Sequence, residues 1–179
     1  LCLGPVEVSV SEMVDAYTTF VNKGIKVEPL YVTRIEDNKG NIISTFTPQY
    51  TEIISEKTSH KMLEMLKAVI NEGTGVRLRY RYQFKGDIGG KTGTTQNNSD
   101  GWFIGVTPEL VSGTWVGGED RSIHFDNLRE GQGASMALPV WALYMQKVYA
   151  DETLGYSDTL KFDIPEQLHK EYKECVSND

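Results

Sequence analysis

Three strand-like runs in the middle of the chain constrain its fold most strongly. They cover residues 88–94, 102–106 and 110–116, and only short connections separate them. Strands joined so closely pair as antiparallel neighbours, because a crossover between parallel strands needs about a dozen residues or more. The second connection, Thr107-Pro108-Glu109, suits a tight turn. The sequence therefore predicts an antiparallel sheet in this region.

Helical patterns stand before and after these strands. Ser9 opens a capping box, and the apolar face that follows predicts a helix over residues 9–23. A second apolar stripe predicts a helix over 55–72. A third helix covers about 136–150, on condition that Pro139 lies in its first turn. The predicted fold class is α+β, an antiparallel sheet flanked by helices.

Two other segments give weaker patterns. The β-rich runs 30–35 and 42–46 flank the turn-forming residues 37–40 and predict a hairpin. Residues 77–84 alternate between charged and mostly aromatic side chains, and strand and irregular structure both stay open there.

The sequence predicts a boundary between a domain and a tail at residue 150. The glycine-rich stretch 117–133 is predicted as a loop, and residues 1–150 as one domain that includes it. Residues 151–179 form a charged, aperiodic tail, for which a surface wrap and partial mobility are both open.

Composition narrows the classes of partner. The 179 residues carry a net charge of −7, and an acidic surface repels a phosphate backbone, so nucleic acid is not expected. No run of about 18 apolar residues could span a membrane, and no signal-peptide pattern is present. Cys2 and Cys175 cannot form a zinc site, and two free thiols and one terminal bridge are both open. No metal and no cofactor are predicted.

The strongest chemical signal is Lys91-Thr92-Gly93-Thr94 in the first predicted strand. A Lys-Thr-Gly triplet on a strand is one of three motifs of serine acyl-transfer enzymes that act on D-Ala-D-Ala peptides and β-lactams. A strand edge can pair with an extended peptide, Lys91 adds positive potential, and the hydroxyls of Thr92 and Thr94 can donate to a carboxylate. Gly93 permits close approach. The backbone N–H of Thr94 is placed to donate in an oxyanion hole.

Two other interpretations stay open on the triplet alone. The stretch can be a glycine-rich turn with a solvated lysine. Gly90-Lys91-Thr92 also matches the end of a phosphate-binding loop, but no glycine stands five residues before Gly90, where that loop requires its first glycine. The companion motifs of the serine enzymes, Ser-x-x-Lys and Ser-x-Asn, are absent from the 179 residues.

The surrounding residues extend the signal to a family. Residues 90–110 closely resemble the Lys-Thr-Gly strand and following hairpin of class A penicillin-binding proteins. Further segments are similar to the family's helix after Ser-x-Asn, its Asn-x-Gly-Thr-Gly segment, its last strand and its closing helix: 3–8, 16–20, 71–75, 114–117 and 137–141. The resemblance covers about residues 3–148.

This resemblance implies a transpeptidase that crosslinks peptidoglycan stem peptides through a serine, which β-lactams also acylate. It assigns substrate binding to Lys91, Thr92, Gly93 and Thr94, with the Thr94 N–H as the catalytic oxyanion donor. Because the serine motifs are missing, the chain is expected to be the C-terminal part of the domain and inactive alone.

The resemblance also implies a larger parent protein. That protein would be a bifunctional synthase with a glycosyl-transferring domain, held at the outer face of the cytoplasmic membrane by an upstream anchor. Missing partner strands would leave a sheet edge open, which predicts self-association between chains. Three alternatives stay open: a D,D-carboxypeptidase or β-lactamase-related hydrolase, a non-catalytic cell-wall binding module, and a structural partner of wall-synthesis proteins.

Several other residues invite a function. Arg77, Arg79 and Arg81 alternate mostly with aromatic residues, as in a single-strand nucleic-acid groove. A solvated charged face is the preferred interpretation, and contact with an anionic wall polymer is a further hypothesis. Asp100 is interpreted first as a turn former that can also brace the loop beside the strand. The tryptophans are predicted in the core: Trp102, Trp115 and Trp141. Scattered histidines and acidic loop residues lack the spacing of a metal site: His60, His124, His169, Glu119, Asp120 and Asp126.

Overall fold

A computed structural model of the protein describes residues 6–169, and their fold is α+β. The described helices are α1 (Val10–Val21), α2 (Glu56–Asn71), α3 (Arg77–Tyr80), α4 (Leu128–Gly131) and α5 (Gly133–Ala150). The described strands are β1 (Ile25–Val27), β2 (Arg34–Glu36), β3 (Ile42–Thr45), β4 (Tyr50–Glu52), β5 (Gly89–Thr94), β6 (Asp100–Val106) and β7 (Val111–Gly117). Single 3₁₀ turns follow β5 and α5: η1 (Gln96–Asn98) and η2 (Glu152–Leu154).

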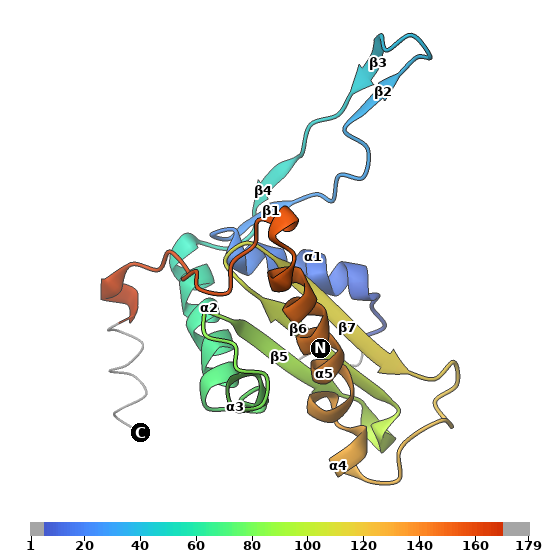
Figure 1. The fold of residues 1–179 in the computed structure, drawn as a ribbon, viewed down its shortest axis with the longest axis vertical. Coiled ribbons are helices and arrows are strands. Elements are labelled where there is room, and N and C mark those ends of the chain that lie inside the picture. Colours follow the sequence, from blue (N-terminus) through green and yellow to red (C-terminus); the bar gives the residue numbers. More distant parts are fainter. Residues whose placement is uncertain (1–5, 170–179) are drawn as a thin grey trace.

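The central sheet contains β5, β6 and β7 in that order, and both neighbouring pairs are antiparallel. The prediction from the short connections is confirmed. Helix α5 covers one face, where a Cβ on Gly105 would collide with the indole of Trp141. Helix α1 covers the other, where Gly113 stands against Val10 and Val14. The sheet is thus a middle layer between helices (Figure 1).

The main core lies between this sheet and α5. The ring centroid of Trp141 is 5.2 Å from that of Phe103 and 5.9 Å from that of Phe84. Edge-on and tilted aromatic pairs of this kind add to the stabilisation that burial provides. A second cluster forms where Leu63 and Leu66 of α2 meet Val106 of β6. Together these contacts fix β5 and its neighbours in position.

Residues 25–52 form an arm that projects from this body (Figure 1). The pair β1–β4 makes its base, and the predicted hairpin, β2–β3, is confirmed at its tip. At the turn, Oδ1 of Asp37 accepts the N–H groups of Lys39 and Asn41, both at 2.8 Å. The arm is therefore held by local hydrogen bonds.

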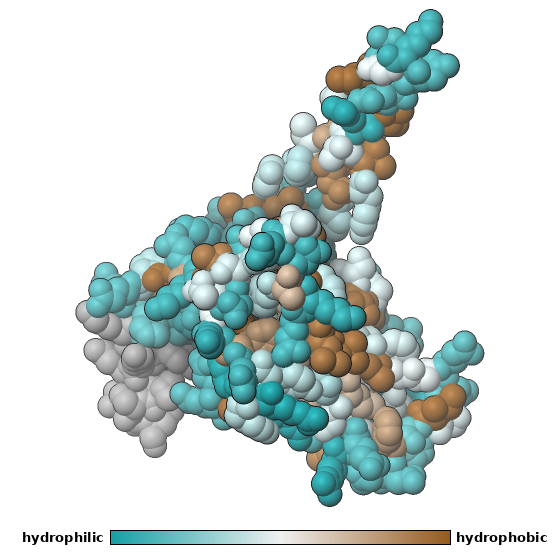
Figure 2. Space-filling model, viewed as in Figure 1, coloured by the Kyte–Doolittle hydropathy of each residue, from teal (hydrophilic) through white to brown (hydrophobic). Residues whose placement is uncertain are grey.

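The arm's ladder is interrupted between base and tip. Pro29 and Pro48 stand in this stretch, and proline cannot donate a ladder hydrogen bond, which explains why the predicted strand 30–35 begins only at Arg34. Figure 2 shows apolar surface along the arm. The exposed large apolar side chains there are Ile25, Leu30, Tyr31, Val32, Ile35, Ile42, Ile43, Phe46 and Tyr50.

Two predictions about the second half need correction, and one open stretch is now assigned. Helix α5 begins at Gly133, so Pro139 lies in its second turn and not in the first. The stretch 117–133 is not all loop, because it contains the short helix α4, which Asn127 caps by accepting the N–H of Glu130. The undecided stretch 77–84 forms the short helix α3 and then a turn. The helices predicted over 9–23 and 55–72 are confirmed as α1 and α2.

The described part of the tail wraps the surface. The carbonyl of Leu160 accepts the N–H of Asp87 at 2.9 Å, and the Asp87 carboxylate accepts the N–H of Phe162 at 3.2 Å. Phe162 and Ile164 pack against the cluster around Leu66. Cys2 and Cys175, with the tail beyond residue 169, lie outside the described residues. Between residues 6 and 169, no helix is long and apolar enough to cross a membrane.

Candidate functional site

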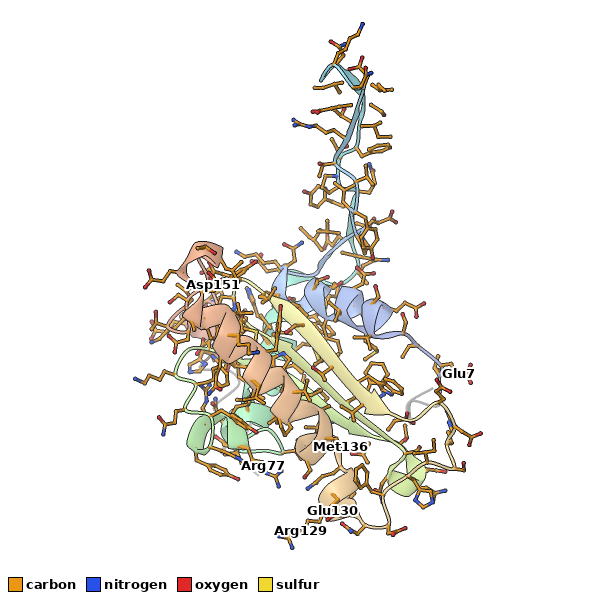
Figure 3. All side chains as sticks on the ribbon, turned by 45° about the vertical axis from the view of Figure 1, so that its right-hand side comes forward. Glu7, Arg77, Arg129, Glu130, Met136 and Asp151 are labelled. Carbon is orange, nitrogen blue, oxygen red and sulfur yellow. The ribbon has the colours of Figure 1, made fainter. Side chains whose placement is uncertain are left out.

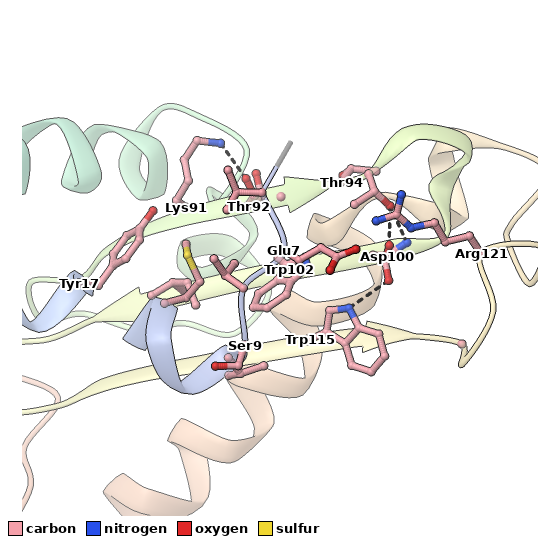
Figure 4. A pocket seen from close by; sticks show the side chains of 18 of the residues that line it. Glu7, Ser9, Tyr17, Lys91, Thr92, Thr94, Asp100, Trp102, Trp115 and Arg121 are labelled. Atoms are coloured by element: carbon pink, nitrogen blue, oxygen red, sulfur yellow. Dashed lines mark hydrogen bonds between the residues drawn. The ribbon is translucent and has the colours of Figure 1, made fainter. Parts of the chain in front are cut away.

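A pocket of about 750 Å³ lies over the α1 side of the central sheet (Figure 4). All four predicted site residues line it, and they come from β5: Lys91, Thr92, Gly93 and Thr94. The opposite wall is residues 6–10 with Met13 and Tyr17 of α1. Burial raises the pKa of the Tyr17 phenol, so that side chain is neutral at physiological pH. The segment has room beside it for an extended ligand.

The register places two tryptophans in this pocket. Gly93 pairs with Trp102, which pairs with Trp115, so all three positions share one face of the sheet. A Cβ on Gly93 would lie 3.1 Å from the Cβ of Trp102. The missing side chain at Gly93 therefore gives room to Trp102 as well as to anything that approaches the strand.

The two threonines of the motif face the other way. The Thr92 hydroxyl lies 2.7 Å from the Thr74 hydroxyl. Oγ1 of Thr94 accepts the N–H of Gly133 at 3.0 Å, which caps the N-terminus of α5. Because that hydroxyl oxygen accepts, its own proton is still available to donate.

Strand β5 is one of the two edge strands of the central sheet, so the backbone groups that do not pair with β6 point to the open edge. The N–H of Thr95 donates to the carbonyl of Asp100 at 3.1 Å. Since bonded and non-bonded pairs alternate along an antiparallel ladder, the N–H of Thr94 points away from β6 toward the edge. Nζ of Lys91 donates to the Thr92 carbonyl at 2.7 Å, so the lysine lies along the same edge.

Helix α5 begins directly behind this strand. A Cβ on Gly133 would collide with the Gly93 and Trp102 carbonyl oxygens, so only glycine permits the contact. Nη1 of Arg77 donates to the Ala134 carbonyl at 3.0 Å and to Oγ of Ser135 at 3.1 Å. Figure 3 shows Arg77 beside the first turn of α5, near Met136. The Gly93–Thr94 region is thus supported from behind by a fixed helix end.

Asp100 joins three parts of the site. Its Oδ2 accepts from Oγ1 of Thr95 at 2.9 Å and from Oγ of Ser99 at 3.2 Å, and its Oδ1 accepts from Nε1 of Trp115 at 3.1 Å. The structure places Asp100 at the start of β6, where it braces the preceding loop. Sequence reasoning gave this bracing only second place.

The tryptophans are not all core residues. Trp141 is fully buried as predicted, but the Trp115 side chain is 41% exposed and Trp102 is half-buried. The prediction of a core position is wrong for Trp115. Its indole N–H donates to Asp100 at the surface, and its ring lines the pocket. The predicted strand pairing sets Trp102 opposite Gly93 and Trp115 opposite Trp102. That register was the signal in the sequence that could have placed both tryptophans beside the motif.

The interpretation of the arginines in and after α3 as a solvated charged face also needs correction. Nη1 of Arg79 donates to the carbonyls of Phe84 and Gly86 at 3.0 and 2.8 Å, and Arg77 ties down α5. Burial is the largest influence on the pKa of Arg79, and it lowers that pKa. These two side chains hold the backbone together and are not a solvated face, whereas Arg81 is exposed.

The histidines and acidic residues form no metal centre in the part of the chain that the structure describes. His60 is buried, its Nδ1 has no hydrogen-bond partner, and its Nε2 lies 3.9 Å from Glu56. Nδ1 of His169 lies 3.1 Å from the Glu64 carboxylate. Each histidine therefore lies beside a single carboxylate of α2, and the two carboxylates are on different turns of that helix.

Known proteins are similar to this chain in sequence and in fold. The family described as the penicillin binding protein transpeptidase domain matches residues 2–117. Penicillin-binding protein 1A of Aquifex aeolicus is 33% identical over 148 residues, which are 83% of this chain and 20% of that protein. Penicillin-binding protein 4 of Bacillus subtilis is 32% identical over 138 residues, covering 77% and 21%. The chain spans about a fifth of the length of these relatives.

Solved structures agree with the sequence matches. Penicillin-binding protein 1A of Haemophilus influenzae superposes with a TM-score of 0.71 at 27% identity, over 81% of this chain and 27% of that one. The apo form of penicillin-binding protein 3 of Mycobacterium tuberculosis shares the fold, with a TM-score of 0.64 at 20% identity over 84% and 37%. The chain belongs to the transpeptidase domain family of penicillin-binding proteins, and within it to class A.

Proposed function

We propose that this chain forms the peptide-binding part of a D,D-transpeptidase that crosslinks peptidoglycan stem peptides and is acylated by β-lactams. One observation carries the proposal: Lys91-Thr92-Gly93-Thr94 lies on an edge strand that borders a 750 Å³ pocket. An edge strand offers main-chain groups to an extended peptide, which adds as a further strand. The family match supports this use of the site.

In this proposal the stem peptide lies along β5 with its terminal carboxylate near Lys91. The Thr92 and Thr94 hydroxyls lie on the other face of β5, bonded to Thr74 and Gly133. In the proposal they donate their protons to that carboxylate around the strand edge, where Gly93 allows close approach. The Thr94 N–H, which points to the open edge, stabilises the negative charge on the carbonyl oxygen as the nucleophile attacks. Because α5 and the loop after β5 hold Thr94, this donor is in place before substrate arrives.

The nucleophile comes from a part of the parent protein outside these 179 residues. Its serine oxygen bonds to the penultimate D-Ala carbonyl carbon, the C–N bond breaks, and D-Ala leaves with a proton. An amine of a second stem peptide then displaces the serine, which regains its proton. Without that serine the 179-residue chain is inactive.

The parent protein in this proposal is a bifunctional synthase. A glycosyl-transferring domain precedes the transpeptidase, and an upstream segment anchors the protein at the outer face of the cytoplasmic membrane. Residues 1–150 are the C-terminal part of the transpeptidase domain, and 151–179 are its tail. The isolated chain associates with itself through its open sheet edge, which sedimentation at increasing concentration would test. A clean monomer at high concentration would contradict it.

A non-catalytic wall-binding module is the second candidate. The observation that favours it is that the 179 residues contain neither Ser-x-x-Lys nor Ser-x-Asn. The two candidates differ in whether the full-length protein forms a covalent bond with penicillin.

Labelled penicillin tests the proposal. The full-length protein should take up the label covalently, and the 179-residue chain should not. Lys91→Ala should slow labelling about tenfold or more, because it removes the positive charge that faces the carboxylate of the antibiotic. Lys85→Ala, an exposed lysine outside the pocket, is the matched control and should change nothing. A full-length protein that takes no label favours the module.

A further inference from the structure

The loop that follows β5 is held in an unusual backbone conformation. Asn97 and Asn98 both have left-handed backbones, with φ of 61° and 55°. Such residues persist where the surrounding structure fixes them. Asn98 exchanges two hydrogen bonds with the backbone of Phe125, and the loop ends Thr95 and Ser99 both donate to the Asp100 carboxylate.

Asp100 and Thr95 close this loop with reciprocal hydrogen bonds. The N–H of Thr95 donates to the Asp100 carbonyl, the N–H of Asp100 donates to Oγ1 of Thr95 at 3.0 Å, and that hydroxyl donates to Oδ2 of Asp100 at 2.9 Å. Three bonds between two residues leave little freedom at Thr95. Thr95 directly follows Thr94, so the same bonds restrain the end of β5.

Thr94 is restrained on its other side as well. Its hydroxyl accepts the N–H of Gly133 at 3.0 Å, and Gly133 is packed against the Gly93 carbonyl. The peptide that carries the Thr94 N–H therefore lies between two fixed points, the end of α5 and the Asp100 carboxylate. Removing the Asp100 carboxylate would leave that peptide held by the ladder pair Gly93–Trp102 and by Gly133 alone.

The carboxylate also orients the pocket wall. Nε1 of Trp115 donates to Oδ1 of Asp100 at 3.1 Å, as the dashed line in Figure 4 shows. Both residues line the pocket together with Thr94. One side chain thus links the end of β5 to the indole on β7.

We propose that Asp100 is a positioning residue that fixes the direction of the Thr94 N–H and the orientation of Trp115. The inference rests on the proposed function, because it assigns the Thr94 N–H to the oxyanion. A carboxylate suits this role because three donors meet there, and two oxygens with several lone pairs can accept all of them. A residue that acts only on stability would leave the chemistry per folded molecule unchanged.

The test uses the full-length protein and labelled penicillin, with the limiting acylation rate and the half-saturating concentration measured separately. Asp100→Ala should lower the limiting rate about tenfold or more per folded molecule, since a small displacement of an oxyanion donor strongly reduces rate. The half-saturating concentration should change less than about twofold. Asp100→Asn, which keeps one acceptor oxygen, should lose less.

A second pair of variants keeps the test valid if Asp100→Ala folds poorly. Thr95→Val removes the linking hydroxyl at constant shape and should also slow acylation, whereas Thr95→Ser should retain the wild-type rate. Asp120→Ala, which removes an exposed carboxylate bonded to the Ser122 N–H, is the control and should change nothing.

Three outcomes decide the matter. If the wild-type protein takes up no label from penicillin, both the proposed function and this inference are overturned. A labelled wild type whose Asp100 and Thr95 variants react at the wild-type limiting rate overturns the inference alone. A labelled wild type with the predicted loss in limiting rate, and with the Thr95→Ser rate retained, supports it.

Discussion

The central sheet and the arm are built from similar residues but are stabilised in different ways. Phe103 and Ile104 of β6 are 0% and 2% exposed, whereas Ile43 and Tyr31 of the arm are 67% and 84% exposed. Sheet residues pack against helices on both faces, but the arm is a two-stranded ribbon in solvent. A two-stranded ribbon alone is marginally stable in water. Packing, and not strand propensity, therefore makes β5 rigid enough to present a candidate site.

The largest expected difference is between buried and exposed aromatic residues. Trp141→Ala should destabilise the body by about 3–5 kcal/mol, because it empties the centre of the main core. Tyr31→Ala in the arm is the matched control and should change stability by less than about 0.5 kcal/mol. Urea unfolding of the two variants measures both values. Equal losses would show that the arm is packed as tightly as the sheet.

Glycine substitutions sharpen the comparison at the level of the backbone. Gly105→Ala should cost about 1–3 kcal/mol, because the new methyl would strike the Trp141 ring and force it aside. Gly40→Ala at the arm tip has open space around it, and its left-handed φ of 82° should cost about 1–2 kcal/mol. The two variants should therefore differ in kind: only Gly105→Ala should alter the near-ultraviolet circular dichroism of the tryptophans. A change of that signal in Gly40→Ala would contradict the account.

The smallest effect is a pH dependence confined to the arm. Hydrogen bonds from Asn41 and Lys39 lower the pKa of the Asp37 carboxyl. A group with a lowered pKa in the folded state stabilises the turn above its ordinary pKa, and this contribution is lost as the pH falls through the lowered value. The amide signals of Lys39 and Asn41 should therefore shift on acidification in nuclear magnetic resonance spectra. The shift should be absent in Asp37→Asn, and a shift that persists there would assign it to another group.

Much of the fold could be predicted because its signals are local. The capping box at Ser9 and the apolar stripe of α2 identify helices by themselves, and the short connections after β5 and β6 leave only antiparallel pairing. The strands β1 and β4 were not predicted, because each is only three residues long and no turn joins them directly, as one joins β2 to β3.

The sequence predicted the motif of the candidate site, but not the tertiary contacts that hold the motif in place. The triplet and the family resemblance predicted Lys91 and Thr94 as site residues, and both line the pocket. The cap that Thr94 gives to α5, and the bond from Trp115 to Asp100, join residues 39 and 15 positions apart. Contacts across such separations exist only after the chain folds. The early start of α5 was missed for the same reason, since its cap is a strand residue.

The most direct test is a crystal structure of the full-length protein acylated by penicillin. The account predicts that the ester carbonyl oxygen of the adduct lies within hydrogen-bond distance of the Thr94 backbone nitrogen, with the antibiotic's carboxylate near Lys91. An adduct held away from β5, or a Thr94 N–H already bonded to another part of the protein, would contradict it.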